Sequence, residues 1–130
     1  EAHILSAHRT PTHAAEFAKS ARERGFGVVI CAAGMAAHLA GAFAANTTLP
    51  VIGIPMKGGV LDGLDALLAT VQMPGGIPVA TTAVGNSGAT NAGLLAVSIL
   101  STTDERLAKA LQDYRDSLKE KVAESNAQLV

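Results

Sequence analysis

Three residues near the start of the chain have side chains that could take part in chemistry. Ser6, His8 and Arg9 lie within the segment SAHRTP, between a short apolar run and a proline. A hydroxyl and a guanidinium are good phosphate ligands, and an imidazole exchanges protons near neutral pH. Thr10 followed by Pro11 is typical of a helix start, whose free N–H groups favour an anion. The same pattern also fits an ordinary helix cap with two solvated charged side chains, so the segment alone leaves both interpretations open.

A second segment of interest, AAGMAAHLAG, spans residues 32–41 and begins at the end of the apolar run VVICA. Its glycines and alanines would let a ligand approach the backbone closely. His38 lies within it, although on pattern alone such a histidine is more often structural than catalytic. Lys57, in a later loop, could contact a ligand or simply be solvated, and Ser87, Thr90 and Asn91, around a later helix start, could cap that helix or form a pocket wall. No GxGxxG or GxxxxGK[ST] motif occurs, so dinucleotide or triphosphate binding of the usual kinds lacks support.

Composition disfavours several other classes of function. The net charge is −1, aromatic residues make up 3%, and there is no basic run, so nucleic-acid binding is not expected. No apolar run approaches the ~18 residues of a membrane span. The four histidines form neither an HExxH motif nor a cluster with cysteine, so no metal site is expected. Cys31 is the only cysteine and lies in an apolar run, as a buried structural residue would. The sequence therefore predicts a cytoplasmic protein.

Short β-like runs alternate with helical patterns along the chain. This alternation predicts a single α/β domain over residues 1–130, with a parallel sheet and helices on both faces. Ligands of such sheets bind at the carboxyl ends of the strands, so the loops after the strands are the places to search. We expect strands at Ala2–Ser6, Val28–Ala32, Val51–Pro55 and Val79–Gly85. We expect helices from Pro11 to Gly25, from about Ala37 to Asn46, from about Val60 to Val71, over Gly88–Leu100, and from Asp104 to about Gln128.

The patterns also predict how some of these elements pack. The run VVICA is typical of a strand buried on both faces. The last helix is expected to open with a capping box from Thr102 to Glu105. The helix over residues 60–71 is expected to carry five apolar residues inward: Leu61, Leu64, Leu67, Leu68 and Val71. The last helix has an apolar seam, expected to pack on the domain or a neighbouring subunit, at Leu107, Leu111, Tyr114, Leu118 and Val122.

Five segments resemble one known family in their order and spacing. They are SAHRTP, AAGMAAHLAG, LPVIGIPM, LDGLDALLATVQMPGGIPVAT and GNSGATNAGLLA. They resemble the class I N5-carboxyaminoimidazole ribonucleotide mutases of purine biosynthesis over Glu1–Leu100 and, more loosely, the last helix. The resemblance implies a flavodoxin-like three-layer α/β/α sandwich with a parallel sheet and a long C-terminal helix. It also implies a homo-octamer that works on a small ribonucleotide without a metal or an organic cofactor.

The resemblance further implies roles for individual residues. His8 would be the general acid and base that moves a carboxylate from the exocyclic N5 to ring C4 of the imidazole ribonucleotide, through CO2. An imidazole can make both proton transfers at neutral pH. Ser6 and Arg9 would hold the substrate phosphate. The pocket would be lined, partly by backbone atoms, by Ala7, Gly34, Ala36, Ala37, His38 and Leu39.

The sequence departs from the pattern of this family in three ways. Met35 stands where the family usually has glycine, and Ala40 where it usually has proline. The family's first strand, its Gly/Ser-rich loop and the following helix do not precede Glu1, so we expect a fragment of a domain of about 165 residues with its first βα unit absent. Two alternatives stay open. One is a related carboxylase that uses CO2 directly, and the other is a non-catalytic module that binds a nucleotide or supports assembly.

Overall fold

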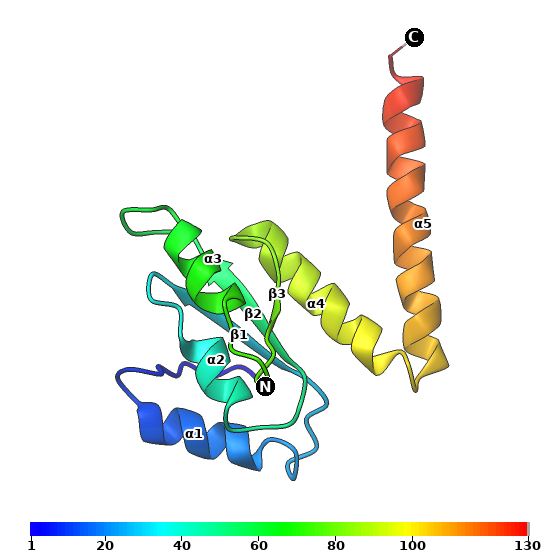
Figure 1. The fold of residues 1–130 in the computed structure, drawn as a ribbon. Coiled ribbons are helices and arrows are strands. Elements are labelled where there is room, and N and C mark those ends of the chain that lie inside the picture. The colour runs from blue at the N-terminus through cyan, green and yellow to red at the C-terminus, as the bar shows by residue number, and fades with distance from the viewer. Residues whose placement is uncertain (130) are drawn as a thin grey trace. The chain divides into compact units, whose positions relative to one another are not determined.

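The computed structural model describes residues 1–129, and the chain forms two compact units, Glu1–Ala96 and Val97–Val130. Strands and helices alternate through the first unit, which confirms the predicted α/β class (Figure 1). α4 begins in the first unit and α5 lies in the second. The elements are α1 (Pro11–Ser20), β1 (Val29–Gly34), α2 (Leu39–Ala44), β2 (Val51–Met56), α3 (Leu64–Val71), β3 (Ala80–Thr81), α4 (Asn86–Leu100) and α5 (Glu105–Ala127).

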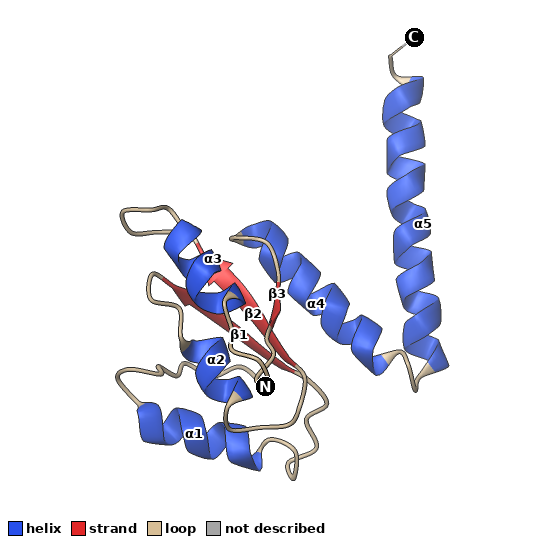
Figure 2. Ribbon diagram, in the orientation of Figure 1, coloured by secondary structure: helices blue, strands red, loops and turns tan. Residues whose placement is uncertain are grey.

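The three strands form one parallel sheet in the order β1-β2-β3 (Figure 2). Val29 of β1 lies opposite Val51 of β2, and the register continues to Gly34 opposite Met56. β3 pairs with the middle of β2 through its two residues. Because all strands point the same way, their carboxyl ends meet at one edge of the sheet, and the loops that follow them are neighbours there.

The two longer strands are buried to different extents. Five of the six residues of β2 are buried, as expected of a strand covered on both faces. In β1 only Val29 and Cys31 are buried, whereas Ile30 is 43% exposed and Ala32 is also exposed. The prediction that this run is buried on both faces was therefore wrong. The reason is that β1 is the outer strand of the described sheet, and α1 and α2 cover only one of its faces.

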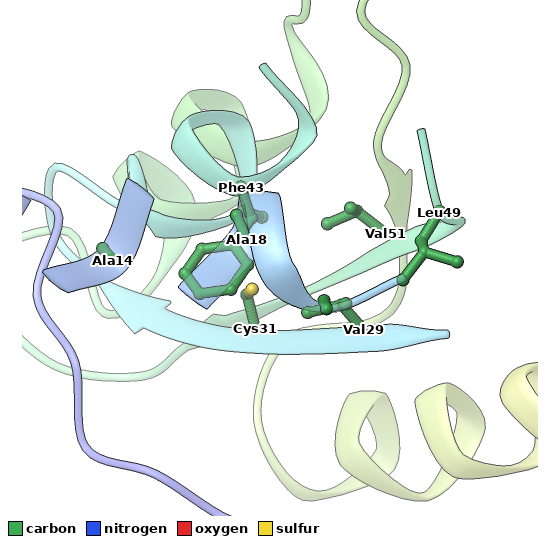
Figure 3. Packing of buried hydrophobic residues seen from close by; sticks show 9 residues of the cluster. Ala14, Ala18, Val29, Cys31, Phe43, Leu49 and Val51 are labelled. Carbon is green, nitrogen blue, oxygen red and sulfur yellow. The ribbon is translucent and has the colours of Figure 1, made fainter. Parts of the chain in front are cut away.

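The core of the first unit lies between the sheet and the helices α1 and α2 (Figure 3). Ala14 and Ala18 of α1 are buried, and their small side chains let this helix pack closely against α2. Phe43 of α2 packs over Cys31 of β1 in the same cluster (Figure 3). Burying an aromatic side chain of this size stabilises the fold by about 2–3 kcal/mol.

Gly53 in the middle of β2 allows α2 and α3 to pack closely on the face of the sheet that carries the Cys31 side chain. A Cβ at Gly53 would collide with the methyl group of Thr70 in α3 and would lie 3.2 Å from Cβ of Ala40 in α2. Gly53 lies opposite Cys31 in the register, so that missing Cβ would point to the same face as the Cys31 side chain. α2 and α3 therefore cover one face together. α4 is drawn on the side of β1 opposite to Phe43 (Figure 3), although Ile30 of β1 stays 43% exposed.

The prediction that the helix over residues 60–71 carries its large apolar residues inward was wrong. Residues 60–63 form turns, and in α3 the buried residues are Ala66 and Thr70. The tight approach at Gly53 has room only for such small side chains, so the larger ones face outward. Four of them are between 47% and 55% exposed, namely Leu61, Leu64, Leu68 and Val71.

Two predicted strands also differ from the structure. Ala2–Ser6 is not a strand, because an extended segment becomes one only through hydrogen bonds to a neighbour, and within residues 1–129 no strand pairs with it. The strand predicted over residues 79–85 is regular only in β3. Beyond β3 two backbone bonds to β2 continue without regular strand pairing: the N–H of Thr82 donates to the carbonyl of Gly53 (3.0 Å), and the N–H of Gly85 donates to the carbonyl of Pro55 (2.9 Å).

The second unit consists mainly of α5, which begins differently from the prediction. Asp104 is the N-cap, and its carboxylate accepts from the backbone N–H of Arg106 (2.9 Å). The predicted capping box from Thr102 to Glu105 was wrong, because the Thr102 hydroxyl instead donates to the carbonyl of Ile99 (2.7 Å). A carboxylate suits the positive end of a helix, and the hydrogen bond from the Arg106 side chain lowers the pKa of Asp104.

The apolar seam of α5 is exposed over most of its length. None of the residues of this helix is buried, and Tyr114, Leu118 and Val122 are exposed. Leu107 and Leu111 are half-buried. Among the helices that the structure describes, none combines the length and the apolar character needed to cross a bilayer.

Candidate active site

The segment from Ser6 to Thr10 folds into a closed turn ahead of α1. The backbone N–H of Thr10 donates to the carbonyl of Ser6 (3.0 Å), and the Thr10 hydroxyl donates to the same oxygen (3.1 Å) and accepts from the Ser6 N–H (2.9 Å). The N–H of Arg9 donates to Oγ of Ser6 (3.1 Å). Thr10 is the N-cap by position and Pro11 opens α1, as predicted, but no side chain caps the helix. The Thr10 hydroxyl stabilises the turn instead, which leaves the N-terminus of α1 open.

The loop that follows β1 makes two tight turns before α2 begins. The N–H of Ala37 donates to the carbonyl of Met35, and the N–H of His38 donates to the carbonyl of Ala36, both at 2.8 Å. Each is a three-residue turn. His38 then takes the N-cap position of α2, where its carbonyl accepts from the N–H of Ala42 (2.9 Å). The backbone of His38 is therefore held from both sides.

The two loops bring two histidines into contact. Nε2 of His8 lies 2.8 Å from Nδ1 of His38, within hydrogen-bonding distance. The ring centroids are 4.9 Å apart and the ring planes cross at 81°. Both rings are exposed, so a ligand can reach them. The sequence placed both residues in one site but gave no reason to expect a bond between them.

The same two loops line a cavity of about 800 Å³ at the carboxyl end of β1. A cavity of this size accommodates a small-molecule ligand. Of the nine residues that the sequence assigned to the site, Ala37 does not line the cavity and is buried (1% exposed). The other eight all line it, namely Ser6, Ala7, His8, Arg9, Gly34, Ala36, His38 and Leu39.

The cavity wall also includes residues that were not among the nine assigned to the site. Ala32 and Ala33 belong to the segment over residues 32–41 that the sequence already indicated, since ligands bind at the loops that follow the strands. Ile4 could not be predicted, because its position depends on Ala2–Ser6 staying outside the sheet. The additional lining residues are Ile4, Leu5, Thr10, Ala32, Ala33 and Met35.

A second hollow, of about 630 Å³, lies at the other end of the strands. Leu49 and Pro78 line it, and they precede β2 and β3, so it lies at the amino ends of these strands. Its arginine, Arg22, is already bonded through Nη2 to the hydroxyl of Thr48 (2.9 Å). Ligands of open α/β sheets bind at the opposite, carboxyl end, so the cavity with the two histidines is the better candidate.

Other reactive groups are remote from this cavity or unsuited to catalysis. Across residues 1–129, no three His, Cys, Asp or Glu side chains gather in a way that could hold a metal ion. Cys31 is buried in the core, and burial raises the pKa of its thiol to about 12. Such a thiol stays protonated and packs as a small apolar side chain. His8 and His38 are therefore the candidate acid and base groups of the cavity.

Comparison with known proteins assigns the chain to a family. Residues 1–121 match the family model described as AIR carboxylase. The chain belongs to the AIR carboxylase family. It is 57% identical over 130 residues to the N5-carboxyaminoimidazole ribonucleotide mutase of Bacillus subtilis, covering 100% of this chain and 80% of that protein.

Further relatives support the same assignment. The mutase of that name from Brucella melitensis is 52% identical over 124 residues, covering 95% of this chain and 76% of that protein. A crystal structure of Treponema denticola PurE matches with a TM-score of 0.83 and 27% identity, covering 97% of this chain and 77% of that one. This member of the AIR carboxylase family thus has the predicted flavodoxin-like α/β fold.

The geometry bears on Met35 and Ala40, the two positions where the resemblance led us to expect other residues. Met35, where the resemblance implies glycine, has φ 52°, in the left-handed region that glycine adopts without strain. Ala40, where the resemblance implies proline, is the second residue of α2. The first turn of a helix tolerates proline because its N–H groups lack partners within the helix. Neither departure removes a group that could take part in chemistry.

We expect Met35→Gly to raise the free energy of unfolding by about 0.5–1 kcal/mol. The left-handed conformation costs a non-glycine residue about 1–2 kcal/mol, and the added flexibility of the unfolded chain offsets part of the gain. The Met35 side chain is 60% exposed, so little burial is lost. Denaturant titration measures the change. Met35→Ala is the matched control, because it keeps a Cβ at the same φ and should bring no gain; equal gains from both variants would contradict the strain argument.

Proposed function

We propose that this chain is an isomerase of purine biosynthesis, which converts N5-carboxyaminoimidazole ribonucleotide into 4-carboxy-5-aminoimidazole ribonucleotide. The mutases to which it is similar along its whole length support this assignment. The observation that carries the proposal is that His8 and Arg9 line one cavity beside the open N-terminus of α1. This places a proton carrier next to a site for an anion.

The reaction needs a proton donor and a proton acceptor at one place, and His8 serves as both. Protonated His8 gives a proton to N5, the C–N bond of the carbamate breaks, and the bonding pair stays on N5 as CO2 leaves. Ring C4 then attacks the carbon of CO2, and the C4 proton returns to neutral His8. The two transfers cancel, so His8 ends in its starting state and no oxidant or reductant is consumed.

The substrate phosphate is expected to lie between Arg9 and the N-terminus of α1. Arg9 is exposed on the cavity wall. Because no side chain caps α1, its first N–H groups are free to donate to an anion. Oγ of Ser6 accepts from the backbone N–H of Arg9, so the hydroxyl proton of Ser6 remains available for a phosphate oxygen.

The small residues of the cavity suit the CO2 step. Ala7, Gly34 and Ala36 line the wall near the two histidines, and Leu39 adds apolar surface. CO2 is small and carries no charge, so it can rest against such a wall. Excluding water keeps the CO2 from hydration until C4 attacks. Ala37 is buried behind this wall and is expected to support the loop that carries it, through the hydrogen bond from its N–H to the carbonyl of Met35.

A substrate assay tests this function. Purified protein should convert N5-carboxyaminoimidazole ribonucleotide in the absence of added bicarbonate. Turnover of the uncarboxylated ribonucleotide only with bicarbonate would instead identify a carboxylase that uses CO2 directly. Binding of the ribonucleotides without any turnover would identify a non-catalytic module. Either of these outcomes would refute the mutase assignment.

We also propose that the chain assembles into a homo-octamer. Two exposed apolar surfaces support self-association. The first, the α3 face, consists of Leu61, Leu64, Leu68 and Val71. The second, the α5 seam, consists of Leu107, Leu111, Tyr114, Leu118 and Val122. Large exposed apolar patches usually mark protein interfaces. Sedimentation equilibrium gives the number of copies, and a monomer at micromolar concentration would contradict the proposal.

We expect Leu68→Glu to weaken self-association by about tenfold or more. Leu68 lies in the middle of the α3 face, and an unpaired carboxylate in an apolar interface costs several kcal/mol. Sedimentation velocity over a dilution series measures the shift. Thr12→Glu is the matched control, because Thr12 is exposed in the first turn of α1, where an added carboxylate is tolerated. If both variants dissociate equally, net charge and not the α3 face is responsible.

We place the enzyme in the cytoplasm and propose that it needs no metal or organic cofactor. Proton transfer to and from His8 is sufficient for both bond changes. The single cysteine permits no internal disulfide, which is usual for proteins of a reducing compartment. Activity that persists in the presence of a metal chelator would support the cofactor proposal, and loss of activity that added metal restores would refute it.

A further inference from the structure

The bond between the two histidines restricts which ring nitrogen of His8 can carry the proton. The bond joins Nε2 of His8 to Nδ1 of His38 (2.8 Å), so Nε2 is already engaged. Within residues 1–129, no hydrogen bond involves Nδ1 of His8. Because His8 lines the cavity, Nδ1 is the nitrogen left for a ligand. The two nitrogens of an imidazole are distinct, and the partner of one sets the protonation of the other.

Only one direction of this bond is compatible with both proton transfers. If His8 donates from Nε2, its Nδ1 is a free base when the ring is neutral and an acid when the ring is protonated. If His38 donates from Nδ1 instead, neutral His8 carries its proton on Nδ1 and has no free lone pair to accept another. Protonated His8 must also donate from Nε2, since both of its nitrogens carry protons. The bond can therefore stay unchanged through the whole cycle only with His8 as its donor.

We propose that His38 is a positioning residue that holds His8 in the Nε2–H tautomer, so that Nδ1 of His8 carries the proton between N5 and C4. This rests on the mutase function proposed above. His38 accepts at Nδ1 and therefore keeps its own proton on Nε2. It does not itself exchange a proton with the substrate.

The surroundings of the pair support this role. In many enzymes a carboxylate orients the catalytic imidazole, but the residues that line this cavity include no Asp or Glu. His38 is the group within hydrogen-bonding distance of the His8 ring. Its backbone is fixed by the turn at Ala36 and by the first turn of α2, where the N–H of Ala42 donates to its carbonyl. A fixed backbone and a 2.8 Å bond are what an orienting group requires.

Nitrogen-15 NMR of the free protein tests the tautomer without any assay of turnover. At mildly alkaline pH, where imidazoles are neutral, His8 should show a protonated Nε2 and an unprotonated Nδ1. Its signals are assigned by their loss in His8→Asn. In His38→Leu, which removes the acceptor, His8 should show a mixture of both tautomers. In His38→Asn, whose amide oxygen can take the place of Nδ1, the wild-type signals should return.

Kinetics of the same variants complete the test. His38→Leu should lower kcat roughly 10- to 100-fold, in the range found for lost orienting groups, with a smaller change in KM. His38→Asn should restore most of kcat. Protonated Nδ1 in neutral wild-type His8, or wild-type kcat in His38→Leu, would overturn the proposal. An inactive wild type would refute the mutase function instead, and the tautomer measurement would still stand on its own.

Discussion

His8→Asn is expected to lower kcat by about 100- to 10,000-fold, the range for loss of general acid–base catalysis. Asparagine is similar in size and remains polar, but it neither gives nor takes a proton near neutral pH. The variant should therefore still bind the ribonucleotide, because the proposed phosphate ligands Ser6 and Arg9 are unchanged. Rapid-quench kinetics measure the loss of turnover, and calorimetric titration with the substrate measures the retained affinity.

A matched control separates the proton carrier from a general effect of removing imidazole. His13 is exposed on α1 and does not line the cavity. His13→Asn should therefore leave kcat within about twofold, as surface substitutions usually do. Unchanged turnover in His8→Asn would remove His8 from the mechanism. A loss of affinity as large as the loss of turnover would make His8 a binding residue.

The strands were predictable from the sequence to within two residues at β1 and β2. Both are continuous apolar runs, and glycine or proline marks where they begin. The direction in which α3 turns its leucines was not predictable, because it depends on the contact between Gly53 and Thr70. These residues are 17 positions apart, and periodicity within the helix carries no information about that contact. Large apolar residues at helical spacing fit an outward face as well as an inward one.

The residues of the candidate site were easier to predict from the sequence than the contacts between their side chains. The segments SAHRTP and AAHL pointed to the site through their resemblance to a known family, and the structure brings His8 and His38 to one cavity. Their hydrogen bond depends on the two tight turns that begin at Met35 and Ala36. Met35 has a left-handed backbone conformation, which is uncommon for methionine and therefore not predictable from the sequence. The Thr10 hydroxyl is a similar case. Its type and position predicted a helix cap, whereas it bonds to Ser6 and leaves the helix open.

Arg9→Met is expected to raise KM by about 10- to 100-fold, with a much smaller effect on kcat. A hydrogen bond to a charged group contributes about 1.5–3 kcal/mol, which corresponds to this range. The phosphate is remote from N5 and C4 and its charge does not change during the reaction, so the contact is equally strong in substrate and transition state. Losing a contact that is equally strong in both states raises KM and leaves kcat unchanged. Steady-state kinetics with the ribonucleotide measure both constants.

The control for this variant removes the same charge elsewhere. Arg115 is exposed on α5, so Arg115→Met changes the net charge equally and should leave KM within about twofold. Arg9→Lys sharpens the test, because lysine keeps the charge but lacks the planar fork that binds two phosphate oxygens at once. An intermediate KM for Arg9→Lys would indicate a bidentate contact. If Arg9→Met lowered kcat and left KM unchanged, Arg9 would act on the reacting carboxylate, and the phosphate would have to lie elsewhere in the cavity.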